Sequence, residues 1–337
     1  MQMLLKNVRR LVLVSLMLLG AFPTRNATAQ SPDEITFALG WLPSGVYAMY
    51  FVALDKGYYK DANLSVKIVR GFGSGDTVKR IAASQADVGS ADFGALMAAK
   101  GQGKIPVKVI AIVEGESPSG ILYRTETGIK VPADLKGKTI ARSASGAGSA
   151  ILQAFFDANK MPMDSVNFVV TDASGYLPLL LSKKVDAIAE QAVVLPKYSI
   201  PAAKEGITLK AMTFSEAGLS FYGATIITND DTIAKRSDAL RRFLSATFKG
   251  YQTTFANPRE AAEILLKYHP ESGSMESLLG ELEIEQGLIM TDDVKKHGLG
   301  FINAEKLERS RALLTKALNL PTETKADELY SSDLLPK

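Results

Sequence analysis

The chain has 337 residues, a formal net charge of +3 and no cysteine. The absence of cysteine excludes a disulfide framework, a thiolate nucleophile and a cysteine-ligated metal site. The two histidines, His269 and His297, lie far apart in helical-looking surroundings, so neither a histidine-based metal site nor a catalytic triad is expected. We therefore expect no metal and no other cofactor.

The first 29 residues have the three parts of a secretory signal peptide. Lys6, Arg9 and Arg10 form a basic start, residues 11–22 are an apolar run, and Ala27-Thr28-Ala29 offers small residues for cleavage. The apolar run is only about half of the ~20 residues that a membrane-spanning helix needs. We expect cleavage near Ala29 and no membrane insertion of the mature chain.

Removal of residues 1–29 takes away four basic residues and no acids, which changes the formal charge from +3 to −1. A nucleic-acid-binding protein needs an excess of lysine and arginine in its binding domain, so nucleic acid is not an expected partner. The remaining 308 of the 337 residues are enough for two lobes. Because no cysteine is present to carry a lipid, we expect a soluble, monomeric protein of the periplasm.

From residue 35 to residue 228, short β-rich runs alternate with helical stretches, which is typical of an α/β protein with parallel strands. A helix is predicted over residues 46–56 and ends at Gly57. Asn63 is expected in the left-handed conformation, which asparagine tolerates better than most residues. The clearest predicted strands are residues 35–39, 65–69, 107–113, 167–170 and 223–228.

After about residue 230 the pattern is almost purely helical. The predicted helices cover residues 237–255, 258–268, 275–287 and 304–318. Ser237 and Asn303 are expected to cap two of them, and Pro258 suits the first turn of another. Since no further strand is predicted, we expect this region to pack on the first lobe.

A weak internal repeat favours two lobes of like construction. In residues 78–92 and again in residues 177–190, a helix and a turn are followed by an aspartate, a short apolar strand and an acid where that strand ends. The predicted division is 1–29 signal peptide, 30–122 lobe 1, 123–222 lobe 2, and 223–337 return to lobe 1 with the C-terminal helices. Residues 120–124 and 223–228 are then the crossings, and Tyr222 lies near the hinge.

Two glycine-rich turns stand before predicted helices. The first, RGFGSGD at 70–76, lacks the Gly-Lys-Ser/Thr ending of a phosphate loop, and Asp76 would repel a phosphate. Ser74 or Asp76 is expected to cap the helix that follows. The second turn, RSASGAGS at 142–149, lies between a predicted strand at 139–141 and a predicted helix at 150–159. Turns of this kind at the carboxyl ends of strands let the backbone approach a ligand and donate N–H groups to it.

The candidate ligand-binding residues lie at these turns and strand ends. Trp41, the only tryptophan, follows the first strand and could stack on a flat ligand, with Tyr47 as a weaker candidate. Three acids each follow an apolar strand: Asp92, Glu114 and Glu190. They favour a ligand that donates hydrogen bonds or carries positive charge, whereas Arg70 and Arg142 would suit an anion. The full set is Trp41, Tyr47, Ser74, Gly75, Asp92, Glu114, Arg142, Ser145, Gly146, Ser149, Glu190 and Tyr222.

Several segments resemble the periplasmic substrate-binding proteins of nitrate, sulfonate and taurine ABC importers, which share a domain with fungal thiamine-pyrimidine synthases. The segments, in order, are GWLP at 40–43, VALDKGYYKDANLSV at 52–66, GSGD at 73–76, QADVG at 85–89, DLKGKTI at 134–140 and VDA at 185–187. The resemblance implies a periplasmic binding protein-like fold of type II, with two α/β lobes around a ligand cleft and the C-terminal helices on lobe 1.

The resemblance implies a non-catalytic receptor that delivers a small molecule to an inner-membrane ABC permease with its ATPase. The acids favour a nitrogen-rich or aromatic ligand, such as a thiamine-precursor pyrimidine. An alkanesulfonate, taurine, nitrate or an aromatic carboxylate stays open as the alternative ligand. A pyrimidine-synthase-like enzyme is a remote alternative, because the cysteine-rich motif of the fungal synthases is absent here.

Overall fold

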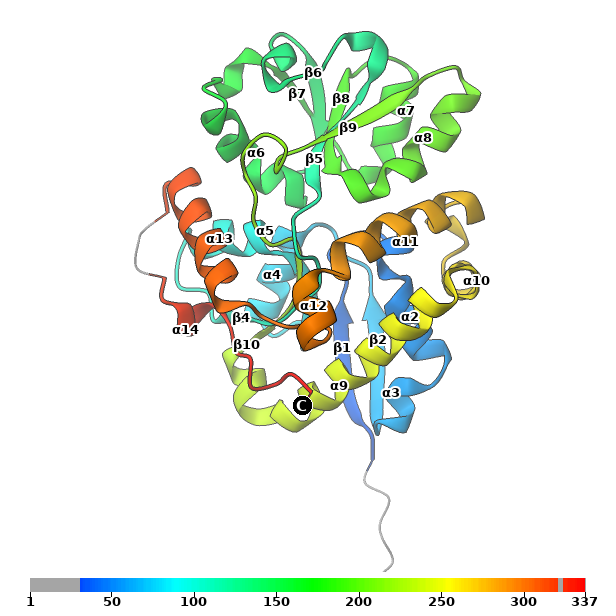
Figure 1. Ribbon diagram of the computed structural model, residues 1–337, viewed down its shortest axis with the longest axis vertical. Coiled ribbons are helices and arrows are strands. Elements are labelled where there is room, and N and C mark those ends of the chain that lie inside the picture. Colours follow the sequence, from blue (N-terminus) through cyan, green and yellow to red (C-terminus); the bar gives the residue numbers. More distant parts are fainter. Residues whose placement is uncertain (1–30, 321–323, 337) are drawn as a thin grey trace, which may run out of the picture. The chain divides into compact units, whose positions relative to one another are not determined.

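The computed structural model describes residues 31–320 and 324–336. Two five-stranded sheets, each flanked by helices, make up this part of the chain (Figure 1). We call the part built on the first sheet lobe 1 and the part built on the second sheet lobe 2. The predicted signal peptide lies outside the described residues. Within the described ranges, no helix combines the length and the apolar character needed to cross a membrane.

The sheet of lobe 1 has the strand order β2-β1-β3-β10-β4. Strand β1 pairs in parallel with β2 and β3, and β10 runs antiparallel to both β3 and β4. The bounds are β1 (Asp33–Ala38), β2 (Leu64–Val69), β3 (Val88–Asp92), β4 (Val107–Ile112) and β10 (Ala224–Asn229). The strand β10, from the far end of the α/β region, therefore lies between two strands that precede it by more than a hundred residues.

The sheet of lobe 2 has the strand order β7-β6-β8-β5-β9 and repeats the same pattern of directions. Strand β6 pairs in parallel with β7 and β8, and β5 runs antiparallel to β8 and β9. The bounds are β5 (Ser119–Arg124), β6 (Thr139–Arg142), β7 (Asn167–Val170), β8 (Ala187–Gln191) and β9 (Leu209–Thr213). The like construction predicted from the internal repeat is confirmed.

Helices cover the sheets and continue through the C-terminal region (Figure 1). Before β10 they are α2 (Ala48–Asp55), α3 (Tyr58–Asp61), α4 (Ser74–Ala82), α5 (Phe93–Lys100), α6 (Ala147–Ala158), α7 (Tyr176–Leu181) and α8 (Leu195–Lys204). After β10 they are α9 (Asp230–Ala256), α10 (Pro258–Tyr268), α11 (Met275–Ile289), α12 (Asp292–His297), α13 (Ala304–Ala317) and α14 (Ala326–Leu329). A one-turn 3₁₀ helix, η1 (Gly45–Tyr47), precedes α2.

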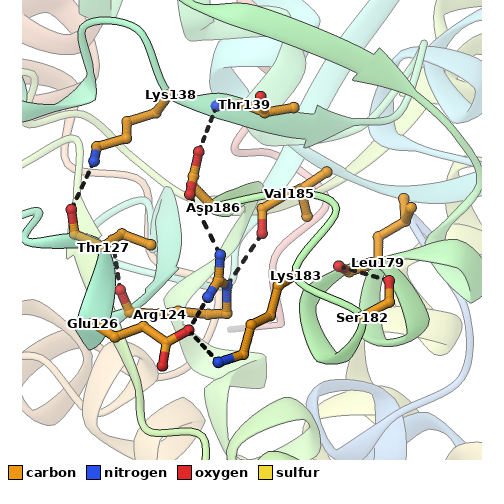
Figure 2. Close-up of polar contacts among 10 residues, drawn as sticks. All are labelled: Arg124, Glu126, Thr127, Lys138, Thr139, Leu179, Ser182, Lys183, Val185 and Asp186. Atoms are coloured by element: carbon orange, nitrogen blue, oxygen red, sulfur yellow. Dashed lines mark hydrogen bonds and ion pairs between the residues drawn. The ribbon is translucent and has the colours of Figure 1, made fainter.

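The repeated aspartate plays the same part in both lobes. In lobe 1, Asp87 accepts a hydrogen bond from the backbone N–H of Thr36 at 2.7 Å and pairs with Arg236 at 2.6 Å. In lobe 2, Asp186 accepts from the N–H of Thr139 at 2.9 Å and pairs with the buried Arg124 at 3.4 Å (Figure 2). Each aspartate thereby fixes the start of its own strand, β3 or β8, against the neighbouring parallel strand, β1 or β6.

Arg124 is the centre of a wider polar cluster at the end of β5, where β8 begins. Its Nε donates to the carbonyl oxygen of Val185 at 3.2 Å, and its guanidinium also pairs with Glu126 (Figure 2). Lys183 reaches Glu126 from the other side at 3.0 Å, which lowers the pKa of Glu126. These contacts join the end of β5 to the turn before β8. Strands β5 and β8 are neighbours in the sheet.

The local features predicted from the sequence are confirmed only in part. Asn63 has a φ of 53°, and Asn303 caps α13 by accepting from the N–H of Glu305 and Lys306. Neither Ser74 nor Asp76 caps α4, because Asp76 pairs with Arg80 and Ser74 accepts from the N–H of Asp92. Helix α9 starts at Asp230 with Asn229 as its cap, whereas the prediction was Ser237; a non-helical kink at Arg236 lies directly before the predicted start.

The lobe crossings and the C-terminal helices also differ in detail from the prediction. The chain leaves the first sheet after Ile112, and residues 119–122 already belong to β5 of lobe 2. Helices α9 and α10 pack on α2 of lobe 1, as expected. Helix α11, however, packs against α8 of lobe 2 as well as against α10, and α13 contacts both α5 and α6. The C-terminal region therefore contacts both lobes.

An aromatic cluster fixes α2 between the first sheet and α9. Phe37 on β1 contacts Tyr50 at a ring separation of 4.6 Å, and the hydroxyl of Tyr251 donates to the Tyr50 hydroxyl at 2.7 Å. All three side chains are fully buried. Because each buried aromatic side chain removes a large apolar surface from water, this cluster holds α2, and with it Tyr47 and Tyr50, rigidly beside the strand ends.

Candidate functional site

A cavity of about 570 Å³, which includes its opening to solvent, lies where the carboxyl ends of strands from both sheets meet. Such a position is the usual ligand site of open α/β sheets. The lining residues come from both lobes: Gly40, Trp41, Val46, Tyr47, Tyr50, Ser74, Ser90, Ala91, Asp92, Val113, Glu114, Ser143, Gly146, Ala147, Gly148, Tyr176, Ala189, Glu190, Gln191, Ala224 and Glu285.

The structure brings seven of the twelve predicted site residues to this cavity: Trp41, Tyr47, Ser74, Asp92, Glu114, Gly146 and Glu190. Tyr47 is buried beside Gly40, at which an added Cβ would lie 3.0 Å from the Tyr47 hydroxyl. Gly146 is the N-cap of α6, and its N–H donates to the Ser143 hydroxyl at 2.7 Å. The N–H groups of Ala147 and Gly148, in the first turn, have no partner within the helix and can donate to a bound molecule.

Gly75 and Ser145 contact each other instead of lining the cavity. The N–H of Gly75 in lobe 1 donates to the carbonyl oxygen of Ser145 in lobe 2 at 3.1 Å, and the Ser145 hydroxyl donates to the carbonyl oxygen of Phe72 at 2.6 Å. A Cβ on Gly73 would lie only 2.2 Å from the Ser145 carbonyl oxygen. The glycines of the first turn thus allow the two lobes to approach, and we call this set of contacts the interlobe latch.

Arg142, Ser149 and Tyr222 are also absent from the residues that line the cavity. The guanidinium of Arg142 lies over the Phe168 ring at 5.1 Å, and Ser149 is in the first turns of α6 with its hydroxyl oxygen buried. Tyr222 is buried against α13, where its N–H donates to the Ser310 hydroxyl at 3.2 Å and its ring lies under Lys306. The structure therefore places none of these three against a ligand in the cavity.

Trp41 separates two spaces of different character. On one side is the polar cavity; on the other is a larger, mainly apolar groove lined by side chains such as Leu177, Tyr198 and Met275, with Arg70 and Lys197 among its polar residues. A Cβ on Gly146 would lie 3.8 Å from the edge of the indole, so the indole reaches across the cleft to lobe 2. It offers a flat apolar surface at the mouth of the cavity.

Asp92 and Glu190 end the equivalent strands β3 and β8, but they are differently engaged. Asp92 already accepts hydrogen bonds at both oxygens, from the Gly94 N–H and the Ser117 hydroxyl, each at 2.8 Å. Asp92 thereby caps the start of α5. Glu190 accepts from the N–H of Gln191, while its buried Oε2 receives no hydrogen bond of good geometry from the described residues.

Burial raises the pKa of both carboxyl groups. The pKa of Asp92 rises to about 6 because burial outweighs the hydrogen bonds from Ser117 and Gly94. The pKa of Glu190 rises to about 7 because burial outweighs the Gln191 N–H, the charge of Lys197 and the nearby Trp41 indole. Strongly shifted carboxyl groups in a cleft are typical of functional sites.

Two further acids, which the sequence interpretation missed, lie on α11. Glu285 lines the cavity beside Glu114, and Glu281, one turn earlier, accepts from the N–H of Gly45 at 2.6 Å. They occur on the same buried stripe of α11 as Leu278, Leu282 and Ile289. Carboxylates at helical spacing within an apolar stripe were therefore the signal in the sequence that identifies them.

No cation balances these acids at the cavity wall: among the described residues that line it there is no lysine or arginine. In the described part of the chain, no group of three or more histidine, aspartate and glutamate side chains is arranged to hold a metal ion. His269 packs against Phe51 and pairs with Glu271, while His297 stacks on Phe301. The cavity is thus acidic, aromatic at its mouth, and supplied with free N–H groups at the start of α6.

A family model and individual known proteins both match this chain. The family model described as "NMT1/THI5 like" matches residues 45–261, more than half of the chain. A formylaminopyrimidine-binding protein of Halalkalibacterium halodurans is 23% identical over 95% of this chain and 97% of its own length. A 4-amino-5-hydroxymethyl-2-methylpyrimidine phosphate synthase of Saccharomyces cerevisiae is 26% identical over 72% of this chain and 73% of its own length.

Among solved structures, the periplasmic aliphatic sulphonate binding protein of Escherichia coli superposes with a TM-score of 0.68 at 14% identity. The match covers 90% of this chain and 99% of that protein. At this identity the likeness concerns the fold alone, which is the type II periplasmic binding protein fold predicted above. The chain belongs to the NMT1/THI5 like family.

Proposed function

We propose that this protein is the solute-binding component of an ABC importer and captures a small nitrogen-rich or aromatic molecule in the interlobe cavity. It works in the periplasm as a monomer, closes on its ligand, and delivers that ligand to an inner-membrane permease with its ATPase. Within the proposed ligand class, a pyrimidine related to thiamine precursors or a similar heterocycle is the leading candidate.

The observation that carries this proposal is the composition of the cavity wall. Trp41 offers a flat apolar face, and Glu190 offers a buried oxygen that lacks a donor of good geometry in the described structure. A buried acceptor without a partner costs free energy, which a ligand N–H would recover. An amino-substituted aromatic ring supplies both the flat face and the N–H donor.

The same wall argues against the anionic alternatives. A nitrate, sulfonate or carboxylate would need cationic partners, and the described cavity lining contains neither lysine nor arginine. Arg70 stacks on Phe72 and lines the outer groove, and Arg142 lies over Phe168. The free N–H groups at the start of α6 suit the ring nitrogen or carbonyl acceptors of a heterocycle.

The rival function is that of a pyrimidine-producing enzyme, because a fungal synthase matches most of the chain. The sequence has no cysteine, and no histidine lines the described cavity, so neither a thiolate nor an imidazole is available to take part in chemistry there. The relative that binds formylaminopyrimidine matches a larger share of this chain than the synthase does, which supports a receptor.

Thermal unfolding of the purified mature chain, residues 30–337, tests the proposal. A panel of aminopyrimidines, flavins, aromatic acids, sulfonates and nitrate separates the ligand classes. The ligand is expected to raise the free energy of unfolding by about 2.7 kcal/mol at a concentration 100 times its Kd. Stabilisation by a heterocycle without turnover supports the receptor. Stabilisation by sulfonates alone, or formation of product, contradicts it.

A further inference from the structure

Glu114 and Glu285 form a pair of buried carboxyl groups in the wall of the cavity. Glu114 follows β4, and Glu285 comes from α11; their exposed fractions are 2% and 1%. Glu114 Oε2 accepts from the N–H of Ala224 at 2.8 Å. The two carboxyl groups lie close enough to share a hydrogen bond when one of them carries a proton.

The groups that surround this pair are acidic or neutral. Asp92 on β3 and Glu281 on α11 add negative charge, and Glu190 faces the cavity from β8. The hydroxyls of Tyr47 (η1), Tyr50 (α2) and Tyr251 (α9) are near enough to feel the charge of Glu285. Lys197 on α8 acts on Glu190 and Glu281 and lines the outer groove, but it is not among the groups that shift the pKa of Glu114 or Glu285.

Two carboxylates cannot both stay ionised in such a place, because burial and mutual repulsion disfavour the second charge. Burial and the neighbouring acids raise the pKa of Glu114 to about 8 and that of Glu285 well above its usual range. At neutral pH the empty site therefore holds at least one proton on the pair. Apart from a proton shared with Glu114, no N–H or O–H donor of the described residues reaches the buried Oε2 of Glu285.

We propose that the Glu114–Glu285 pair is a cation subsite that exchanges its shared proton for a positively charged nitrogen group of the ligand. The inference rests on the proposed function, since it concerns the same cavity. The proton leaves Glu285 for solvent as an ammonium, amidinium or protonated aminopyrimidine-type group arrives. No covalent bond of the ligand changes, and the net charge of the site is the same before and after.

The choice of ligand group follows from this exchange. A planar amidinium presents two N–H donors to a carboxylate, and such charge-assisted pairs are about twice as strong as neutral hydrogen bonds. A neutral amide of the same shape cannot replace the proton, so the second carboxylate would stay protonated. The pair thereby makes Glu285 a specificity-determining residue, although it lies in the C-terminal helical region.

Benzamidine and benzamide are matched probes, because they share shape and aromatic ring and differ in charge. Isothermal titration at pH 7 in phosphate and in Tris, whose ionisation enthalpies differ, counts the protons released on binding. We expect benzamidine to bind at least about tenfold more tightly than benzamide, which corresponds to ~1.4 kcal/mol. We also expect benzamidine to release close to one proton, and benzamide none.

Glu285→Gln and Glu283→Gln are matched variants two residues apart on the same helix. Glu285→Gln should lower benzamidine affinity by about tenfold or more and abolish proton release, since the charged partner is lost. Glu283→Gln should leave both values close to wild type, because the Glu283 side chain is exposed and is outside the cavity lining. Thermal unfolding of each variant establishes that it folds.

Equal binding of the two probes, no binding of either, or an unchanged proton count in Glu285→Gln would overturn the cation subsite. In that case a heterocycle from the wider panel that still binds the wild type leaves the receptor function standing. If no compound of the panel stabilises the protein, the proposed function itself fails. The two failures are therefore distinguishable in the same set of titrations.

Discussion

The N–H of Gly75 in lobe 1 donates to the carbonyl oxygen of Ser145 in lobe 2 at 3.1 Å, beside the mouth of the cavity. Gly73, two residues earlier, has a φ of 128° and approaches the same carbonyl so closely that a Cβ there would lie 2.2 Å from it. The interlobe latch therefore depends on a backbone without side chains at these positions.

Gly73→Ala is expected to weaken ligand affinity strongly, by about tenfold or more, because the added methyl group blocks the latch. Gly137→Ala is the matched control, since Gly137 also has a positive φ (76°) but a Cβ there meets nothing within 4 Å. Both variants should lose about 1 kcal/mol of stability from the backbone strain. Titration with the best ligand checks the difference; equal affinities in the two variants would exclude a role of the latch in closure.

Trp41→Ala should weaken binding of an aromatic ligand by roughly 1 to 3 kcal/mol, since it removes the stacking surface. Trp41→Phe keeps an aromatic face and should restore part of that loss. Calorimetric titration of the three proteins with one ligand measures the effect. An unchanged affinity in Trp41→Ala would show that the ligand does not touch the indole.

The stability of the empty protein should fall as the pH rises from about 4.5 to 8. The folded pKa values are about 6 for Asp92, about 7 for Glu190 and Glu281, and about 8 for Glu114. These values lie above the unfolded ones, so the folded state binds more protons over this interval and loses stability as they dissociate. Each pKa unit corresponds to about 1.4 kcal/mol.

Denaturant unfolding at a series of pH values measures this dependence. Glu285→Gln should flatten the curve, because it removes one of the coupled acids and its repulsion of Glu114. A saturating cationic ligand should reverse the slope, since the ligand favours the ionised pair. A free energy of unfolding that rises steadily from pH 5 to pH 8 in the empty protein would contradict the assignment of raised pKa values.

Much of the fold follows from the sequence because it depends on local patterns. The alternation of apolar strands and helices predicts the α/β lobes, and the repeated Asp87 and Asp186 predict their likeness. Trp41, Glu114 and Glu190 reach the cavity because the carboxyl ends of parallel strands share one edge of a sheet.

The rest depends on contacts between distant segments, which local patterns do not encode. Glu285 enters the cavity only because α11 packs between the lobes. Ser145 hydrogen bonds to the first glycine-rich turn instead of lining the cavity, because the two turns contact each other. A kink at Arg236 separates the first turns of α9 from the predicted helix that starts at Ser237, so the prediction does not include the residues from Asp230 to the kink. Tyr222 is near the crossing, yet it packs against α13.

Asp186→Ala and Asp87→Ala should each lower the free energy of unfolding by about 2 kcal/mol or more. Each change removes the partner of a strand N–H and of an arginine, and partly buried charges are costly without their partners. The exposed pair Asp231–Lys235 provides the control, and Asp231→Ala should cost less than about 0.5 kcal/mol. Chemical denaturation compares the three; equal small effects would mean that the aspartates do not fix the strands.

Trp41 is the only tryptophan of the chain, so its fluorescence reports directly on the cavity mouth. Fluorescence titration with the compound that most stabilises the protein is the most direct test of the receptor. We predict a saturable change in the emission of Trp41 with one ligand per chain and a Kd equal to the calorimetric value. A ligand that stabilises the protein but leaves this emission unchanged would place the binding site elsewhere and contradict the account.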